Sequence, residues 1–286
     1  MLRTSAKVNL ALEVLGKRDD GYHEIATVMQ AVDLCDRLTV ETADTVSLVV
    51  SDPALPTDDG NLIVRAAAML GEAAGATKGA RITLDKHIPV AAGLGGGSSD
   101  AAATLWALNR LWGLRWSRDR LAALAVRLGM DVPFFLGTGR ALATGRGEQL
   151  EPLPGAGAYA LVLVNPNVPL STREVYGRVP AGWTAEARST RRMVEALRTR
   201  SARTVAGALA NNLESIVEPM VPVIRHMKSA LLAAGALGAV MSGSGPTVFG
   251  VARSYDHARQ IRSRVNRAGW SCWAVRTVSG RVIRAV

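Results

Sequence analysis

Residues 89–100 read Pro-Val-Ala-Ala-Gly-Leu-Gly-Gly-Gly-Ser-Ser-Asp, and the chain then continues directly into an alanine- and leucine-rich run at residues 101–112. Four glycines among the five positions 93–97 remove the Cβ atoms that would keep a ligand away from main-chain N–H groups. Ser98, Ser99 and Asp100 are helix N-cap types, and the run behind them favours a helix. A glycine loop that leads into a helix N-terminus is a binding site for phosphate groups.

Two familiar phosphate-binding motifs do not fit this stretch. A P-loop requires Lys-Ser or Lys-Thr after its last glycine, whereas Gly97 is followed by two serines. The dinucleotide fingerprint requires Gly-x-Gly-x-x-Gly, but counted from Gly93 or from Gly95 its last position is Ser98 or Asp100. A flexible linker is the remaining alternative, and it is disfavoured because a linker would not lead directly into a strong helix.

The composition is that of a globular protein. The chain has 286 residues with 48% hydrophobic content, enough for one large or two smaller domains. The sequence has no apolar run of membrane-spanning length and no signal-peptide core. Its two cysteines, Cys35 and Cys272, lie far apart without Cys-x-x-Cys spacing, which indicates reduced thiols and no metal site. We expect a cytoplasmic protein, a monomer or weak homodimer, with no membrane partner.

The net charge of +10 and the pI near 10.4 are typical of nucleic-acid-binding proteins. Here, however, the basic residues are mostly arginines scattered through predicted helices, as in residues 188–203, without interleaved aromatic residues to stack on bases. A positive field also suits an enzyme whose substrates are polyphosphates. We therefore expect small-molecule substrates and no nucleic-acid partner.

Hydrophobic periodicity and turn residues predict an α+β protein. The glycine- and proline-rich residues 152–157 predict a domain boundary, which gives domains at 1–153 and 154–286, and the last strand is expected to pack back on the first domain. The strand at 45–50 is expected to pair with the two before it. Strands are predicted at residues 8–15, 28–34, 37–41, 45–50, 80–84, 140–144, 149–153, 159–164, 239–241, 247–251 and 271–277. Helices are predicted at residues 61–75, 101–112, 118–128, 171–176, 186–200 and 221–234.

Asp131 is the only charged residue in the apolar stretch 128–136. An isolated acid in such a setting is either paired or functional, and in phosphoryl transfer a carboxylate can orient or deprotonate the attacking hydroxyl group. The alternative is a helix-capping role at the turn before Pro133. Lys7 lies on the same side of an alternating strand as Asn9, and it faces either water or a cleft.

Tyr22 and His23 follow the turn Asp19-Asp20-Gly21. Aromatic and imidazole side chains that follow a tight turn are candidates for binding a flat base, and the alternative for His23 is an ordinary surface position. Tyr176, in the predicted helix 171–176, is a further candidate, with a core position on the helix as its alternative.

Three blocks of the sequence resemble the GHMP kinases, the family of galactokinase, homoserine kinase and mevalonate kinase. The first is Ala6-Lys7-Val8-Asn9-Leu10 followed by Asp20-Gly21-Tyr22-His23-Glu24, the second is the glycine loop, and the third is Met241-Ser-Gly-Ser-Gly-Pro-Thr-Val-Phe249. They occur in the family's order and extend over almost the whole chain. The resemblance implies ATP-dependent phosphorylation of an alcohol, and the first block resembles the branch that acts on a cytidine diphosphate of a sugar alcohol.

The resemblance also implies a two-domain fold, with an N-terminal domain like domain 2 of ribosomal protein S5, a ferredoxin-like C-terminal domain and a deep cleft between them. It implies that Asp131 is the catalytic base and that Lys7 pairs with it and polarises the accepting hydroxyl group. For the substrate, it implies binding by Asn9, with Tyr22 and Tyr176 on the two faces of cytosine and His23 at its polar edge. The residues implied to bind ATP are Pro89, Val90, Ala91, Ala92, Gly93, Leu94, Gly95, Gly96, Gly97, Ser98 and Ser99.

The third block is interpreted as support for the phosphate loop, although a simple turn between helix and strand is the alternative. Ser98, Ser99 and Thr247 are candidate ligands of Mg²⁺. Because the sequence has no carboxylate cluster, we expect phosphate oxygens and water to supply most ligands of the ion. Two other functions stay open: a GHMP kinase for a different small alcohol such as homoserine, and a non-catalytic family member that senses a ligand.

Overall fold

The protein is described by a computed structural model that covers residues 1–75, 78–154, 157–267 and 269–285. Residues 155–156 of the predicted domain boundary lie outside this range. Within it, eight strands form one sheet and four form a second. The first sheet holds β1 (Leu2–Lys17), β2 (His23–Ala43), β3 (Val46–Val50), β4 (Gly79–Asp85), β5 (Arg140–Thr144), β6 (Gln149–Pro152), β8 (Ala210–Asn211) and β12 (Ile283–Ala285). The second holds β7 (Ala160–Asn165), β9 (Ala239–Met241), β10 (Val248–Ala252) and β11 (Ser271–Arg276).

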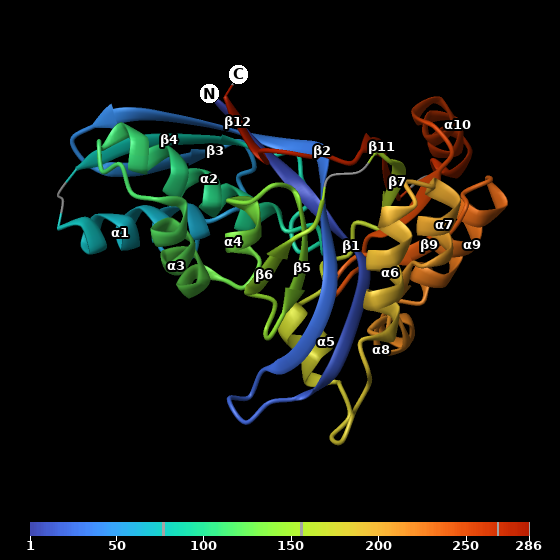
Figure 1. The fold of residues 1–286 in the computed structure, drawn as a ribbon. Helices are drawn as coiled ribbons and strands as arrows, with labels where there is room; N and C mark the ends of the chain where they lie inside the picture. Colours follow the sequence, from blue (N-terminus) through green and yellow to red (C-terminus); the bar gives the residue numbers. More distant parts are fainter. Residues whose placement is uncertain (76–77, 155–156, 268, 286) are drawn as a thin grey trace.

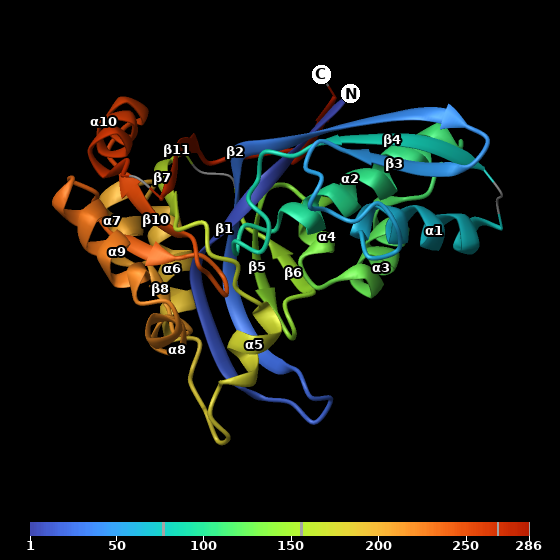
Figure 2. The same cartoon turned by 180° about the vertical axis from the view of Figure 1, so that it is seen from behind.

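Helices cover both sheets, and the predicted α+β class is confirmed. The long strands β1 and β2 cross the middle of the molecule, with α1–α4 on one side and the second sheet with α6–α10 on the other (Figures 1 and 2). The helices are α1 (Leu62–Ala74), α2 (Gly96–Leu111), α3 (Arg118–Leu128), α4 (Val132–Phe135), α5 (Thr172–Gly177), α6 (Arg188–Arg198), α7 (Ala202–Gly207), α8 (Glu214–Met220), α9 (Val223–Ala233) and α10 (Tyr255–Val265).

The β1–β2 hairpin differs from the sequence prediction at one point. The two strands predicted at 28–34 and 37–41 are one continuous strand, because Cys35 and Asp36 between them pair with Ser5 and Thr4 of β1. Ser5 pairs with Cys35 but Ala6 pairs with Val32, so two extra residues of β2 are accommodated there. A bulge of this kind bends a strand and increases its twist without ending it.

The strand β3 also differs from the prediction, which paired it with the strands before it. It pairs in parallel with β4, with Val46 opposite Ala80, and β4 lies between β3 and β2. Helix α1 forms the connection between the two parallel strands, which require such a crossover. The ends of α1 follow the sequence signals, because Asn61 caps its start and Gly75 its end.

The helix after the glycine loop begins earlier than predicted. Its N-cap is Gly95, in the left-handed region at φ +69°, and the helix runs from Gly96. The predicted cap residues 98–100 therefore lie inside the helix, as its third to fifth residues. Left-handed backbone is readily adopted by glycine, so the glycines allow the helix to start within the loop itself.

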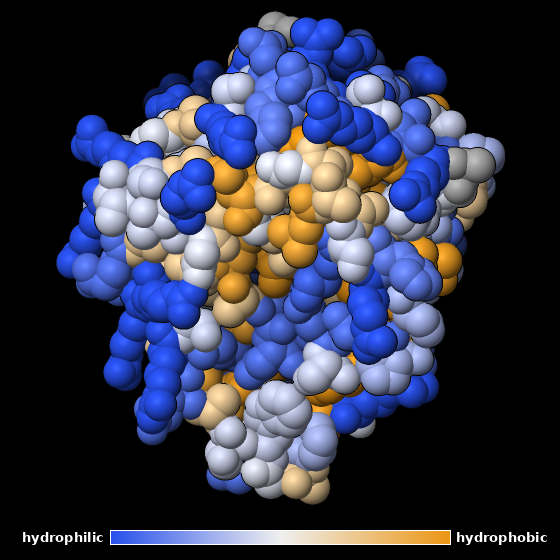
Figure 3. Space-filling view, turned by 90° about the vertical axis from the view of Figure 1, so that its right-hand side faces the viewer, coloured by the Kyte–Doolittle hydropathy of each residue, from blue (hydrophilic) through white to orange (hydrophobic). Residues whose placement is uncertain are grey.

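The second sheet has the strand order β11-β7-β10-β9, and all its pairings are antiparallel. With helices after β7 and β10, this arrangement is that of a ferredoxin-like βαββαβ unit. The short β12 pairs with β1, so the two chain termini lie side by side (Figure 1). Seen from the side of α10, hydrophilic side chains frame a smaller apolar area (Figure 3). Among the described residues, no helix combines the length and apolar character needed to cross a bilayer.

Candidate active site

The glycine loop is held between β1 and the turn that joins β9 to β10. The backbone N–H of Lys7 donates to the carbonyl oxygen of Leu94 at 2.9 Å. From the other side, the hydroxyl of Ser242 donates to the carbonyl oxygen of Gly93 at 3.0 Å. A Cβ atom on Gly93, whose φ is +74°, would stand only 2.2 Å from the Ser242 carbonyl oxygen. The third sequence block therefore packs directly against the phosphate loop.

The same turn also passes over the side chain of Lys7. A Cβ atom on Gly243 would lie 3.2 Å from Lys7 Nζ and 3.1 Å from Asn9 Oδ1. The side-chain amide of Asn211 fixes this turn by donating to the carbonyl oxygens of Met241 and Gly243 at 2.9 and 2.8 Å. The absence of a side chain at Gly243 thus leaves space for the ammonium group of Lys7.

Lys7 and Asp131 form an ion pair. Lys7 Nζ lies 3.3 Å from Asp131 Oδ2, and the lysine side chain is 5% exposed whereas that of Asp131 is 35% exposed. Lys7 also donates to Asn9 Oδ1 at 2.7 Å, and the Asn9 amide in turn donates to the hydroxyl of Thr27 at 2.8 Å. Asp131 precedes α4 but makes no side-chain capping hydrogen bond to it. The buried ammonium group is therefore fixed by β1 and β2, and the carboxylate lies at the accessible end of the pair.

His23 and Tyr176 are brought together from the two halves of the chain. Their ring centroids are 5.4 Å apart, with a tilt of 43° between the planes. Burial and the charge of Lys17 lower the pKa of His23, which favours the neutral imidazole. Burial and the negative charge of Asp131 raise the pKa of the Tyr176 phenol. The aromatic pair therefore lies within the electrostatic reach of the Lys7–Asp131 pair.

Tyr22, the residue before His23, is 50% exposed. The guanidinium carbon of Arg146, in the turn between β5 and β6, lies 5.0 Å from the centroid of the Tyr22 ring. The structure thus places Tyr22 beside Arg146 and His23 beside Tyr176.

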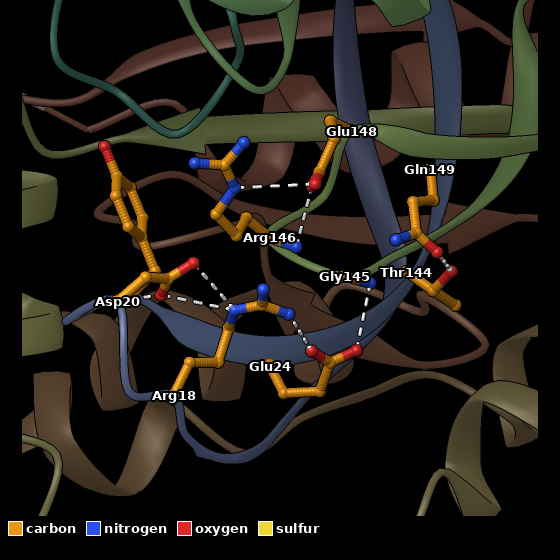
Figure 4. A network of polar contacts seen from close by, with 9 residues as sticks. Arg18, Asp20, Glu24, Thr144, Gly145, Arg146, Glu148 and Gln149 are labelled. Carbon is orange, nitrogen blue, oxygen red and sulfur yellow. Dashed lines mark hydrogen bonds and ion pairs between the residues drawn. The ribbon is translucent and has the colours of Figure 1, made fainter.

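A polar network joins the tip of the β1–β2 hairpin to the β5–β6 turn (Figure 4). Glu24 accepts hydrogen bonds from the Arg18 guanidinium at 2.5 Å and from the backbone N–H of Gly145 at 3.1 Å. Asp20 pairs with Arg18 and accepts from the N–H of Tyr22 at 3.1 Å. Sequence patterns did not predict this network, because its two halves are more than a hundred residues apart.

Family models match the chain in two segments. The model of the GHMP kinase N-terminal domain covers residues 61–139, and that of the C-terminal domain covers residues 193–271. The chain belongs to the GHMP kinase family.

Individual relatives agree with this membership. Two proteins named 4-diphosphocytidyl-2-C-methyl-D-erythritol kinase, from Pelotomaculum thermopropionicum and Symbiobacterium thermophilum, are each 47% identical; the alignments cover 97% and 96% of this chain and 97% and 98% of theirs. A crystal structure of 4-(cytidine 5'-diphospho)-2C-methyl-D-erythritol kinase aligns with a TM-score of 0.83 at 38% identity, over 98% of this chain and all of that one. A homoserine kinase from Cytophaga hutchinsonii, at 22% identity and a TM-score of 0.78 over 100% and 96% of the two chains, shares the fold.

A buried ion cluster, which the sequence analysis did not predict, lies next to the phosphate loop of this GHMP kinase. Lys86 pairs with Asp36 and, at 3.1 Å, with Asp100, and the three side chains are 6%, 0% and 2% exposed. The Asp36 carboxylate also accepts from the backbone N–H groups of His87 and Ile88. Because Ile88 precedes the loop and Asp100 lies near the start of α2, the cluster holds both ends of the loop.

Burial and charge act against each other in this cluster. Burial raises the pKa of the Asp100 carboxyl to about 7, although the charge of Lys86 opposes the shift. Burial alone would lower the pKa of Lys86, but the charges of Asp100 and Asp36 hold it above its usual value. The ammonium group is therefore the positive centre on which the two buried carboxylates depend.

The loop geometry predicts different effects for neighbouring glycines. In Gly95→Ala, a non-glycine residue at φ +69° costs about 1–2 kcal/mol, and its Cβ would lie 2.9 Å from Phe135 Cζ. We expect a lower melting temperature, because the folded state is strained. We also expect the ATP dissociation constant to rise by about tenfold or more, which corresponds to a loss of about 1.4 kcal/mol in binding free energy. Calorimetric titration with ATP and thermal unfolding measure the two effects.

Gly97→Ala is the matched variant, because its Cβ would meet only Leu62 Cδ1 at 3.7 Å. Its melting temperature should not fall, so any loss of ATP affinity in this variant reports the approach of phosphate to the backbone. ATP affinity equal to that of the wild type in both variants would remove the loop from the nucleotide site.

Proposed function

We propose that the chain transfers the γ-phosphoryl group of ATP to the 2-hydroxyl group of 4-diphosphocytidyl-2-C-methyl-D-erythritol, giving the 2-phosphate and ADP, in non-mevalonate isoprenoid precursor biosynthesis. The observation that carries the proposal is the ion pair of Lys7 and Asp131 against the phosphate loop of a GHMP kinase. The names of its full-length relatives support the substrate. In this proposal residues 1–153 form the domain with the ATP loop, and residues 154–286 form the second domain.

The ion pair suits phosphoryl transfer to an alcohol. A bond forms between the substrate oxygen and the γ-phosphorus, and the bond from that phosphorus to the β,γ-bridging oxygen breaks. Asp131 accepts the hydroxyl proton, and the Lys7 ammonium stabilises the negative charge that develops on the oxygen. Asn9, which accepts from Lys7 and donates to Thr27, keeps the ammonium in place.

Mg²⁺ is the ion that we propose to accompany ATP, held mainly by phosphate oxygens and water. Among the described residues, no group of three His, Cys, Asp or Glu side chains suits a metal ion. The Ser99 hydroxyl group suits a ligand of this ion, since it is buried near the start of α2 and has no hydrogen-bond partner among the described residues. Ser98 and Ser99 would hold the ion, whereas the hydroxyl of Thr247 already accepts from Asn165 at 2.8 Å. The ion neutralises phosphate charge when bound.

The cytosine base is proposed to lie against the aromatic residues near the hairpin tip. His23 is held on Tyr176 and favours the neutral form, so its ring can both donate to and accept from the polar edge of a base. Tyr22 offers a half-exposed ring for stacking, with Arg146 beside it.

Substitution of these residues should affect the cytidine substrate selectively. Loss of a stacked base costs about 1–3 kcal/mol in nucleic-acid sites, so Tyr22→Ala and His23→Ala should each raise the KM for the cytidine substrate by about 5- to 150-fold. The KM for ATP should change little. His226→Ala, at an exposed position on α9, is the control in steady-state kinetics. An unchanged substrate KM in both variants would place the base elsewhere.

A coupled ADP-release assay tests the proposed function. ADP should be released with ATP and the cytidine diphosphate substrate, and not with ATP and homoserine. Turnover with homoserine but not with the cytidine substrate would overturn the assignment in favour of another GHMP kinase. Binding of ATP and the cytidine substrate without ADP release would indicate a ligand-sensing protein.

A further inference from the structure

A pocket lies in the C-terminal half of the chain, away from the ion pair of Lys7 and Asp131. Its volume is about 290 Å³, and it forms where the start of β7, the end of β10, the end of β11 and the N-terminus of α10 meet. In the sheet, Ala252 and Arg276 both pair with Ala160 at this end, whereas the β9–β10 turn that contacts the phosphate loop lies beyond Val248 at the other end. The pocket is therefore separated from the phosphate loop by the length of the sheet.

Three arginines line this pocket: Arg200, Arg253 and Arg276. Within the part of the chain that the structure describes, none of the three has a carboxylate within ion-pair distance, although other exposed arginines such as Arg188 do. The Arg276 guanidinium lies 3.7 Å from the centroid of the Tyr255 ring. Stacking of this kind fixes the plane of a guanidinium group and leaves its N–H edge available for an anion.

The N-terminus of α10 adds to the positive potential of the pocket. Ser254 caps this helix by accepting from the N–H of His257, and both Ser254 and Tyr255 line the pocket. The positive end of a helix dipole and its first N–H groups favour an anion.

Tyr159 supplies an independent indication of a ligand. It lines the pocket and is 4% exposed, and its hydroxyl group has no hydrogen-bond partner among the described residues. Burial raises the pKa of the Tyr159 phenol, and the positive charges of Arg140 and Arg200 oppose this shift. A buried hydroxyl without a partner destabilises a fold, and an anion in the pocket would give it an acceptor.

We propose that this pocket binds a small anion with two linked phosphate groups, a diphosphate. Three guanidinium groups and a hydroxyl group supply many hydrogen-bond donors for its oxygens, since guanidinium forks bind phosphate through paired hydrogen bonds. The volume of about 290 Å³ is at the lower end for small-molecule sites, which favours a compact anion over a nucleoside polyphosphate.

Calorimetric titration with inorganic diphosphate tests the proposal, with a non-hydrolysable ATP analogue present at saturation so that the phosphate loop is occupied. One equivalent of diphosphate should bind, about tenfold or more tightly than inorganic sulfate. Arg276→Gln and Tyr159→Phe should each weaken binding by about tenfold or more, as expected for hydrogen bonds to a charged group. Arg188→Gln, at an exposed position outside the pocket, is the matched control and should bind as the wild type does.

Tyr159→Phe also separates a binding role from a structural one. Because it removes a buried hydroxyl without a partner, it should raise the melting temperature of the protein without added diphosphate, while it weakens diphosphate binding. Equal binding of diphosphate and sulfate, or wild-type diphosphate affinity in both pocket variants, would overturn the proposal. A lower melting temperature for Tyr159→Phe would also contradict it, because the hydroxyl would then have a partner in the fold.

Discussion

Replacement of Asp131 by asparagine is expected to lower kcat by about 10²–10⁴-fold, the range for loss of a general acid or base. Asparagine keeps the size and polarity of the side chain and removes only the basic carboxylate. Lys7 would lose its partner at 3.3 Å but keep Asn9 at 2.7 Å, so its position should be retained. Steady-state kinetics with both substrates, together with calorimetric binding, measure the effect.

Both substrates should still bind to Asp131→Asn, because the carboxylate is assigned to the transition state. Asp119→Asn is the control, since this acid lies at an exposed position in the first turn of α3. If Asp131→Asn keeps more than about a third of the wild-type kcat, the loss is far too small for a general base. The carboxylate would then serve only as the ion-pair partner of Lys7.

Replacement of Lys86 by methionine is expected to destabilise the fold by about 3–5 kcal/mol, because loss of one member of a buried ion pair leaves uncompensated buried charge. Here two carboxylates, Asp36 and Asp100, would lose their shared cation. As the cluster holds both ends of the phosphate loop, ATP affinity should fall as well. Denaturant unfolding gives the free-energy change, and calorimetry gives the ATP affinity.

The pH dependence of this variant separates loss of charge from loss of packing. Burial raises the pKa of the Asp100 carboxyl in the folded state, and without Lys86 the charge that opposes this shift is lost. Such a group binds a proton more tightly in the folded state, so the fold loses stability as the pH rises through the raised pKa. The cost of Lys86→Met should therefore be larger at pH 8 than at pH 6. An equal loss of unfolding free energy at both pH values would indicate that the variant loses packing and not charge. Lys17→Met, at an exposed lysine, is the control and should lower the free energy of unfolding by about 0.5 kcal/mol or less.

The sequence predicted local features well because they depend on neighbouring residues. Helix α3 begins after Ser117 and ends before Gly129, as the capping signals indicate, and the glycine loop leads into a helix as predicted. The bulge in β2 was missed because polar residues inside a strand have the same pattern as a strand end. The short helices α7 and α8 were also missed, since segments of six or seven residues are set by tertiary packing more than by their own propensity.

Long-range contacts explain why parts of the site were missed. Asp36, Lys86 and Asp100 form one cluster although the first and last lie 64 positions apart in the sequence. Nothing in the local pattern of any of them indicates a shared buried site, and Asp100 has the residue type of a helix cap. The juxtaposition of His23 with Tyr176 likewise depends on the packing of α5 near the hairpin. The assignment of roles to Lys7 and Asp131 required the family resemblance in addition to the residue pattern.

The measurement that tests the central claim most directly is a double-mutant cycle on Lys7 and Asp131. Single variants Lys7→Met and Asp131→Asn, and the double variant, are compared by kcat with the cytidine substrate and ATP. Because groups that act as one catalytic unit are strongly non-additive, the double variant should lose far less activity than the product of the two single losses. Losses that simply multiply would mean that the two residues act independently, and they would contradict the account in which Lys7 and Asp131 transfer the proton and stabilise the charge together.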